Sequence, residues 1–388
     1  MKTNTTVRLS AHLFSLALFM AVTEAVAQEE QQPIKIFGYF QNSFQEWTAF
    51  EDQPKFNSFS LQQLNLFFQK DFGPSWTAFV NFEFVNNFSS SRQWGSANLE
   101  EAWLKYQADM RFNLKLGLLL PIFNNLNEIK NRTPLLPYVI RPLAYETSFS
   151  EIIPIEVLTP VRAFVQAYGF FPSGEVKIDY AAYVGNSPNI NDNSLEGQTG
   201  VDTTATFLVG GRLGVRYREL KLGLSATYDK DNIFESRAAD FDIPRPEWNE
   251  IPKTRLGGDL SYEYANFSFE SEFIKVDMEK DTPGLSANLD FYYATLGYRV
   301  TEKLFLYSSY WVMDSRLVVL TPGLEVSEGG DIRVYTLGGW HRLTDRISLK
   351  AQFSRVISKE ENHLITEDET TTVRDNFSVF GLAVSVFF

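Results

Sequence analysis

The residues of this chain whose types and spacing suggest chemistry are charged side chains at alternate positions of amphipathic segments. Six of them are basic: Lys115, Arg162, Lys177, Arg212, Arg216 and Lys221. Four acidic residues occupy equivalent places in the segments that follow: Asp259, Glu263, Glu270 and Glu272. Where such charges face an enclosed aqueous space, they act on small solutes through the field between them, without forming a bond to the solute.

The sequence contains no comparable pattern for catalysis, metal binding or nucleic-acid binding. The chain has no cysteine, which excludes thiol catalysis and disulfides. His341 stands beside Arg342 and His363 follows Glu360 and Glu361, so neither histidine has a local partner pattern, and no GxSxG motif occurs. The net charge of -13 excludes a nucleic-acid partner, because phosphates require a clustered basic face. We assign no catalytic residue, metal or cofactor, although the members of a Ser-His-acid set need only meet in space.

The N-terminus predicts export. Lys2 and Arg8 precede an apolar run from Leu13 to Val22, and the small residues up to Ala27 precede Gln28. This is the pattern of a secretory signal, so we expect residues 1–27 to be removed and residues 28–388 to form one domain. A run of ten residues is too short for a spanning helix, and no later apolar run approaches 18. If the exported chain enters a membrane, it does so as strands.

The elements that must position the charges are predicted to be strands. Residues 112–120 alternate apolar side chains with Asn113, Lys115 and Gly117, and residues 207–217 repeat this pattern. Sixteen candidate strands follow from it: 34–47, 58–72, 75–86, 97–108, 111–122, 162–172, 175–186, 206–217, 219–229, 254–265, 267–278, 289–300, 303–314, 331–342, 346–357 and 376–388. Their length and even number are typical of an all-β, transmembrane antiparallel β-barrel.

The connections between these strands alternate in length. Short polar turns are expected at 108–110, 172–174 and 218–219, among others. Long polar connections are expected near 48–57, 87–96, 123–161, 187–205, 230–253, 279–288, 315–330 and 358–375. Short turns on one side and long loops on the other are typical of outer-membrane barrels with both chain ends in the periplasm. The alternative is a soluble β-sandwich, whose turns need not divide in this way.

The last residues carry a family resemblance. Phe380, Leu382, Val384, Val386 and Phe388 occupy every second position up to the end of the sequence. This pattern resembles the C-terminal signal by which outer-membrane barrels are recognised for insertion. The resemblance implies a protein of the Gram-negative outer membrane that contacts the barrel-assembly machinery and outer-membrane lipids.

The layout of sixteen strands behind a signal, with no N-terminal soluble domain, resembles the bacterial porin class. Two local strings, FSLQQLNLFFQKDFG and ANLEEAWLKYQADM followed by LLLPIFNN, resemble the phosphate-selective porin O/P type, from which the chain departs in its acidic balance. The resemblance implies a water-filled channel for passive diffusion of ions and small polar solutes, with anions as one candidate class, and a homotrimer. The alternative is a barrel that acts as an adhesin or scaffold through its external loops.

The longest connection, 123–161, is the candidate constriction loop. Porins place a loop at this point that folds into the barrel, and this one contains five prolines and an apolar stretch around Leu135 and Ile140. It carries charges of both signs: Glu128, Glu146, Glu151 and Glu156, with Lys130, Arg132 and Arg141. We expect a transverse field between the basic wall and the acidic part of this loop. The alternatives are a loop packed over the mouth or against a neighbouring subunit, and charges that pair only to fill the interior.

Overall fold

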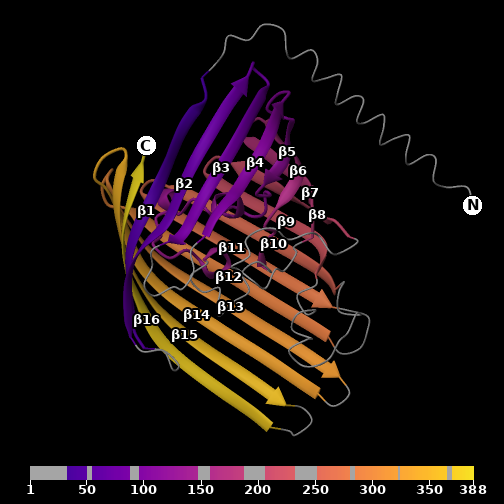
Figure 1. The fold of residues 1–388 in the computed structure, drawn as a ribbon, viewed down its shortest axis with the longest axis vertical. Coiled ribbons are helices and arrows are strands. Elements are labelled where there is room, and N and C mark those ends of the chain that lie inside the picture. Colours follow the sequence, from indigo (N-terminus) through magenta and orange to yellow (C-terminus); the bar gives the residue numbers. More distant parts are fainter. Residues whose placement is uncertain are drawn as a thin grey trace, which may run out of the picture.

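The protein is described here from a computed structural model, which covers residues 33–49, 55–87, 96–146, 158–187, 206–231, 251–279, 285–321, 324–364 and 369–388. Over these residues it is a closed antiparallel barrel of sixteen strands (Figure 1). The strands are β1 (Lys35–Trp47), β2 (Phe56–Phe72), β3 (Trp76–Asn87), β4 (Ser96–Gln107), β5 (Asn113–Leu119), β6 (Ala163–Ser173), β7 (Val176–Gly185), β8 (Leu208–Tyr217), β9 (Leu220–Asp231), β10 (Ile251–Tyr264), β11 (Phe267–Glu279), β12 (Leu285–Arg299), β13 (Leu304–Thr321), β14 (Leu324–Arg342), β15 (Ile347–Leu364) and β16 (Glu369–Phe387).

Each strand pairs with its neighbours in sequence, and β1 pairs with β16 to close the sheet, with Tyr39 opposite Phe387. A closed sheet leaves no edge, which is what lipid requires, because hydrocarbon offers no partner to a free N–H or C=O group. The predicted fold is therefore confirmed, and each of the sixteen predicted strands is present. In the described part of the chain, no helix is long and apolar enough to cross a membrane.

The two faces of the wall differ as the alternation predicts. On the neighbouring strands β8 and β9, Leu213 and Leu224 point outward and are 66% and 72% exposed. The side chains next to them, Arg212 and Ser225, point inward and are buried. The outer face thus offers apolar surface to lipid, and the inner face carries the polar side chains.

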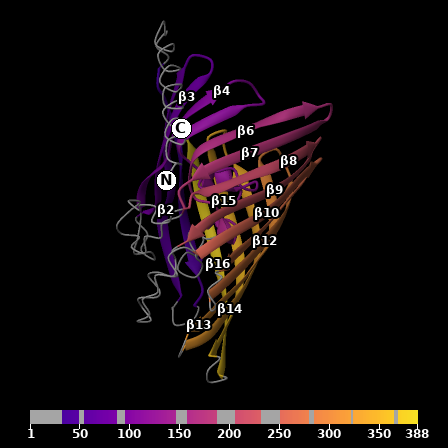
Figure 2. The ribbon, with the colours of Figure 1, turned by 90° about the vertical axis from the view of Figure 1, so that its right-hand side faces the viewer.

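The last four strands are longer than expected. The predicted long connections 315–330 and 358–375 are largely strand, since β13 runs to Thr321, β14 begins at Leu324, β15 runs to Leu364 and β16 begins at Glu369. Figure 1 shows these orange and yellow strands extending beyond the others at one end, and Figure 2 shows the same extension from the side. The prediction was wrong there because strands beyond the lipid need no apolar face, so their sequence loses the alternation that identifies strands in the membrane.

The largest apolar cluster lies inside the barrel, at the side of β10 to β16. Inward-facing Phe291, Trp311 and Val334 are fully buried there. They pack with Ile140 and Leu143 from the connection between β5 and β6. That connection contains three short 3-10 helices, η2 (Asn127–Ile129), η3 (Thr133–Leu135) and η4 (Leu143–Tyr145). Its described part is therefore a component of the interior.

Candidate functional site

The segment from residue 120 to 146, called the inserted segment below, lies against the inner wall of the barrel. Its side chains from Tyr138 to Glu146 are buried, although the segment contains almost no regular structure. It approaches β16 so closely that a Cβ atom on Gly381 would lie 2.9 Å from the Val139 side chain. A glycine is therefore needed at that point of the wall.

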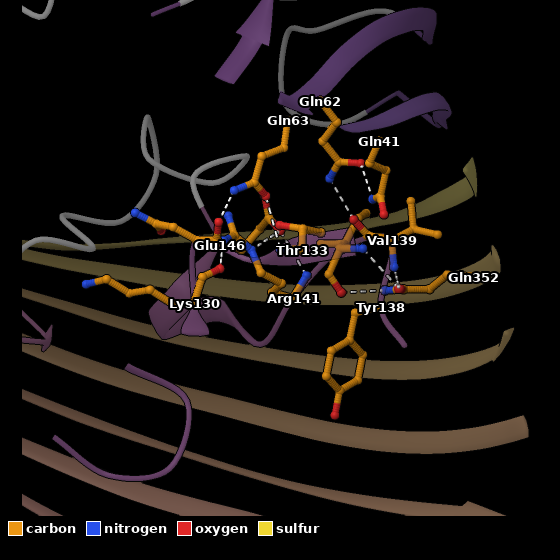
Figure 3. Close-up of polar contacts among 12 residues, drawn as sticks. Gln41, Gln62, Gln63, Lys130, Thr133, Tyr138, Val139, Arg141, Glu146 and Gln352 are labelled. Carbon is orange, nitrogen blue, oxygen red and sulfur yellow. Dashed lines mark hydrogen bonds and ion pairs between the residues drawn. The ribbon is translucent and has the colours of Figure 1, made fainter. Parts of the chain in front are cut away.

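Gln352 of β15 bonds to the main chain of the inserted segment (Figure 3). Its Oε1 accepts hydrogen bonds from the N–H groups of Val139 and Ile140, at 2.8 and 3.0 Å. Its Nε2 donates to the carbonyl of Ile140 at 3.0 Å, and Tyr307 donates to the same Oε1 at 2.9 Å. One side-chain amide thus satisfies three main-chain groups that a buried irregular segment would otherwise leave without partners.

Lys350, two residues earlier on β15, faces the same segment. Its ammonium group is buried and donates to Gln41 Oε1 at 2.8 Å and to the Thr133 carbonyl at 2.8 Å. The carbonyls of Pro134 and Tyr138 lie within 3.3 and 3.4 Å. The Lys350 Nζ therefore has carbonyl oxygens of the segment as its partners instead of water.

Two β-bulges, one between β1 and β2 and one between β3 and β4, turn extra polar side chains toward the inserted segment. The pairing of β1 with β2 shifts at Gln41, so the consecutive residues Gln62 and Gln63 both turn inward and are buried. Gln62 Nε2 donates to the Val139 carbonyl at 2.7 Å, and Gln63 Oε1 accepts from the Thr133 N–H at 3.1 Å. A regular strand would send one of the two glutamines to the lipid.

The second bulge lies where the pairing of β3 with β4 shifts, and it turns Glu100 and Glu101 inward together. Asn131 of the inserted segment donates to Glu100 at 2.7 Å, and Arg132 lies 3.7 Å from the carboxylate of Glu101. The basic part of the segment therefore faces an acidic part of the wall.

Glu272 of β11 bonds to the start of the inserted segment. Its Oε1 accepts from the N–H groups of Asn125 and Leu126 at 2.9 and 2.8 Å. Tyr145, at the far end of the segment, donates its hydroxyl to the other oxygen at 2.5 Å. Burial raises the pKa of the Tyr145 phenol well above its ordinary value, so the hydroxyl remains a donor. One carboxylate thus joins both ends of the described segment.

Arg212 of β8 lies against the inner wall. Arg212 makes two bonds to Asp259 of β10, at 3.0 and 2.7 Å, and a third to Asp179 of β7 at 2.5 Å. Between Arg212 and Asp259 lies Gly223 of β9, where an added Cβ would overlap both the guanidinium and the carboxylate. The missing side chain gives the guanidinium room to cross β9 without projecting into the lumen.

Other charged residues of the inserted segment also have polar partners. Lys115 of β5 lies 3.4 Å from Glu128 and over the rings of Trp103 and Tyr168, at 4.9 and 5.4 Å. Within the segment, Arg141 lies 3.4 Å from Glu146. Lys130 donates to Thr159 at 3.0 Å. The predicted Glu151 and Glu156 lie outside the described residues.

Three of the predicted basic residues form one row across the wall. Lys177 of β7 is directly opposite Arg216 of β8, and Arg216 is directly opposite Lys221 of β9. Lys177 is exposed, half of the Arg216 side chain is exposed, and Lys221 is half-buried. The row lies beside the short turn that joins β8 to β9. Its positive charges are therefore open to water, with Asp179 3.2 Å from Arg216.

The remaining predicted residues are more dispersed. Arg162 is half-buried just before β6, and Glu263 is exposed near the end of β10. Glu270 of β11 accepts a hydrogen bond from Tyr293 at 2.7 Å. The alternate apolar residues of β16 and the residue after it face outward: Phe380, Leu382, Val384 and Phe388 are exposed, and Val386 is half-buried. In the described residues, no group of three or more His, Asp or Glu side chains is placed to hold a metal ion.

The sequence of this barrel matches the model of one protein family, described as Gram-negative porin, over residues 168–361. That match covers half of the chain and runs from β6 into β15. The chain belongs to the Gram-negative porin family. A member of this family is an outer-membrane channel for passive diffusion, so the interior described above is the wall of this porin's channel. No curated protein sequence matches the chain.

Solved structures of similar fold cover almost the whole porin. OmpT of Vibrio cholerae shares 10% identity at a TM-score of 0.56, covering 93% of this chain and 99% of that one. The anion-selective porin of Comamonas acidovorans shares 12% at 0.58, covering 92% and 99%. The channel DcaP of Acinetobacter baumannii shares 9% at 0.57, covering 93% and 99%. At such identities these likenesses show the fold alone.

Sequence reasoning missed several residues that define the interior of this porin. Gln352 and Lys350 occupy ordinary inward positions of β15, and nothing in their spacing shows which segment they contact. The bulges did leave a signal, because Gln62-Gln63 and Glu100-Glu101 are pairs of polar residues that interrupt an alternating strand. Two polar residues in succession within a membrane strand are a sequence mark of a bulge.

The sequence also does not reveal a buried ionic cluster at the ends of β9 and β10. Arg255 of β10 lies 3.0 Å from Asp229 of β9, and Lys253 lies 3.5 Å from the same carboxylate, with all three side chains almost fully buried. The sequence predicts Asp229 as the last residue of the strand 219–229 and Lys253 in the connection 230–253, because the alternation weakens at these strand ends.

Proposed function

We propose that this porin admits small hydrophilic solutes and favours anions. The observation that carries the proposal is the row formed by Lys177, Arg216 and Lys221. Like charges directly opposite each other on adjacent strands destabilise a sheet, by an amount of the order of 0.2–1 kcal/mol per pair. A row of three such side chains with exposed ends is therefore better explained by an effect on solutes than by stability.

The field of this row acts in a confined space. A narrow aqueous opening with low-dielectric walls focuses the field of its charges, so a few exposed basic groups raise the local concentration of anions. Arg212, Lys115 and Arg132 contribute less, because each lies within 4 Å of a carboxylate and is less exposed than Arg216, which keeps half of its side chain in water beside Asp179. Paired charges largely cancel each other's field. We therefore propose the row as the source of the ion preference, in place of the transverse field expected between the basic wall and the acidic part of the inserted segment.

The inserted segment supplies a limit on size. It is bonded to the wall from three strands, β2, β11 and β15, through Gln352, Lys350, Gln62, Gln63 and Glu272. A segment bonded at so many points reduces the bore permanently and is not expected to swing out of the channel. We therefore propose residues 123–161 as the constriction loop of this porin.

The assembly proposed here follows from the sequence. Residues 1–27 act as a signal that is removed near Ala27, and the alternate apolar residues ending at Phe388 direct insertion by the barrel-assembly machinery into outer-membrane lipids. The active form is a homotrimer. Phosphate belongs among the anions to be tested, because two local strings resemble the phosphate-selective porin O/P type.

The reversal potential in a KCl gradient across a planar bilayer tests the ion preference. We expect the wild-type channel to favour chloride, and the variant K177Q/R216Q/K221Q to lose that preference while its channels still open. Arg218→Gln is the matched control, because Arg218 is on the adjacent turn and its charge is paired with Glu175 at 3.1 Å. Equal reversal potentials for wild type and triple variant would refute the role of the row.

A further inference from the structure

Two aromatic side chains face the channel beside the basic row. Tyr168 and Phe170 occupy inward positions of β6, because they follow the fully buried Gln166 at intervals of two residues. Phe170 is directly opposite Asp179 of β7, which also points inward. Both rings are half-buried, and neither belongs to the packed apolar clusters of the described interior. Each ring therefore keeps part of its surface in the channel.

Basic side chains lie over both of these rings. The Lys177 Nζ is 5.8 Å from the ring centroid of Phe170. The Lys115 Nζ is 5.4 Å from the centroid of Tyr168 and 4.9 Å from that of Trp103 on β4. Rings and cations thus alternate along the inner face from β4 to β7, where they join the basic row. A solute in this part of the channel meets ring faces and positive charges together.

The charges nearest to Phe170 are available to a solute. Lys177 is exposed and forms no hydrogen bond or ion pair with any described residue. Arg216, directly opposite, donates from its Nε to Asp179 at 3.2 Å, and half of its side chain is exposed. Asp179 also accepts from Arg212, so two guanidinium groups share this carboxylate. The positive charge of Lys177 therefore has no counter-charge of its own beside the ring.

A partly exposed ring is unusual on the inner face of a water-filled barrel. Inward positions of such a barrel are normally polar, because they contact water. The inward rings of Phe291 and Trp311, at the other side of this barrel, are fully buried in the cluster that includes the inserted segment. Phe170 has no such cover from the described residues. Its place next to an unpaired cation is therefore better explained by a solute than by packing.

We propose that the channel face formed by Tyr168, Phe170, Lys177 and Arg216 binds solutes that combine an aromatic ring with a carboxylate. Aromatic rings pack against each other at centroid separations of about 4.5–7 Å. A ring that packs on Phe170 at this separation lies beside the Lys177 ammonium, so a carboxylate at its border can pair with that group. The planar guanidinium of Arg216 suits a carboxylate as well. This inference rests on the anion preference proposed above and names the class of anion.

Block of the chloride current by three probes tests the inference on the wild-type channel. Benzoate has the aromatic ring and the charge, cyclohexanecarboxylate has the charge without the aromatic ring, and benzamide has the ring without the charge. We expect benzoate to halve the current at a concentration about two- to tenfold lower than cyclohexanecarboxylate, the ratio that corresponds to one aromatic pair. Benzamide should be the weakest of the three. Equal half-blocking concentrations for the two carboxylates would overturn the inference.

Two neighbouring phenylalanines give a matched pair of variants. Phe170→Leu removes the inward ring and keeps an apolar side chain. Phe171→Leu is the control, because Phe171 is the next residue, points outward and is 48% exposed. We expect the two carboxylates to block Phe170→Leu at equal concentrations, and Phe171→Leu to keep the advantage of benzoate. An advantage that persists in Phe170→Leu would show that this ring does not bind the solute.

These results are distinct from those that test the anion preference. A wild-type channel without chloride preference in the KCl gradient would contradict the proposed function. A chloride-selective channel that does not distinguish benzoate from cyclohexanecarboxylate would contradict the aromatic site and leave the anion preference standing.

Discussion

Replacing Gln352 by leucine should release the middle of the inserted segment. Leucine has a similar volume and lacks both polar atoms, so the change removes the acceptor for the N–H groups of Val139 and Ile140 and the donor to the Ile140 carbonyl. It also removes the acceptor for the Tyr307 hydroxyl. Four buried polar groups then have no partner unless the segment moves.

The magnitude follows from the number of groups. A buried donor or acceptor left without a partner costs about 1–3 kcal/mol. The three main-chain groups alone therefore cost about 3–9 kcal/mol if the segment stays in place. This is comparable to the whole stability of a small domain, about 5–15 kcal/mol. We expect the segment to leave the wall, where water can satisfy these groups, and the barrel to remain closed because its ladder is untouched.

Thiol reactivity and conductance measure this release together. Val139→Cys introduces a single thiol at a position that is fully buried in the wild-type background. We expect that thiol to be unreactive with a water-soluble reagent when Gln352 is present, and reactive in the Gln352→Leu background, with a larger and noisier single-channel conductance. Gln352→Glu is the matched control, because it keeps an acceptor for the two N–H groups. An unreactive thiol and unchanged conductance in Gln352→Leu would refute the bonding role of Gln352.

Three further outcomes are expected. Leu224 is at an outward position of β9 and is 72% exposed. Leu224→Arg should lower the free energy of unfolding by about 2–4 kcal/mol if the residue lies near the bilayer midplane. Urea titration in lipid measures this change, and an unchanged midpoint would contradict the assigned face. Gly223→Val should displace Arg212 from Asp259 into the lumen and so lower the conductance. Gly258→Val, on the outer face, is the control and should leave the conductance unchanged. Equal conductances of the two variants would refute the crossing of β9 by Arg212. Tyr145→Phe should lower stability by about 1 kcal/mol through loss of the bond to Glu272, and a stability equal to wild type would show that this bond contributes nothing.

The strands in the membrane were predictable because lipid on one side and polar groups on the other impose a period of two on the sequence. β7 is an example, expected at 175–186 and found at Val176–Gly185. Where one of the two environments ends, the period ends too, and the sequence therefore predicts loops at the outer ends of β13 to β16. The strand order also followed from sequence, because short turns join antiparallel neighbours.

The contacts of the inserted segment were not predictable. Its length, prolines and apolar residues indicated that it packs on something, but the partner of each charge depends on which strands it meets in space. Glu128 forms an ion pair with Lys115, as opposite charges in nearby elements often do. Lys350 instead donates hydrogen bonds to main-chain carbonyls, which carry no sequence signal. Main-chain partners are invisible in a sequence because every residue has them.

The most direct test of the account is a single-channel recording of the purified barrel in a planar bilayer, with neutral solutes of graded size added to the bath. We expect discrete open channels whose conductance falls when small solutes enter the channel and recovers once the solute is too large to pass the inserted segment. Membranes that stay at background current after verified insertion of the folded barrel would contradict it.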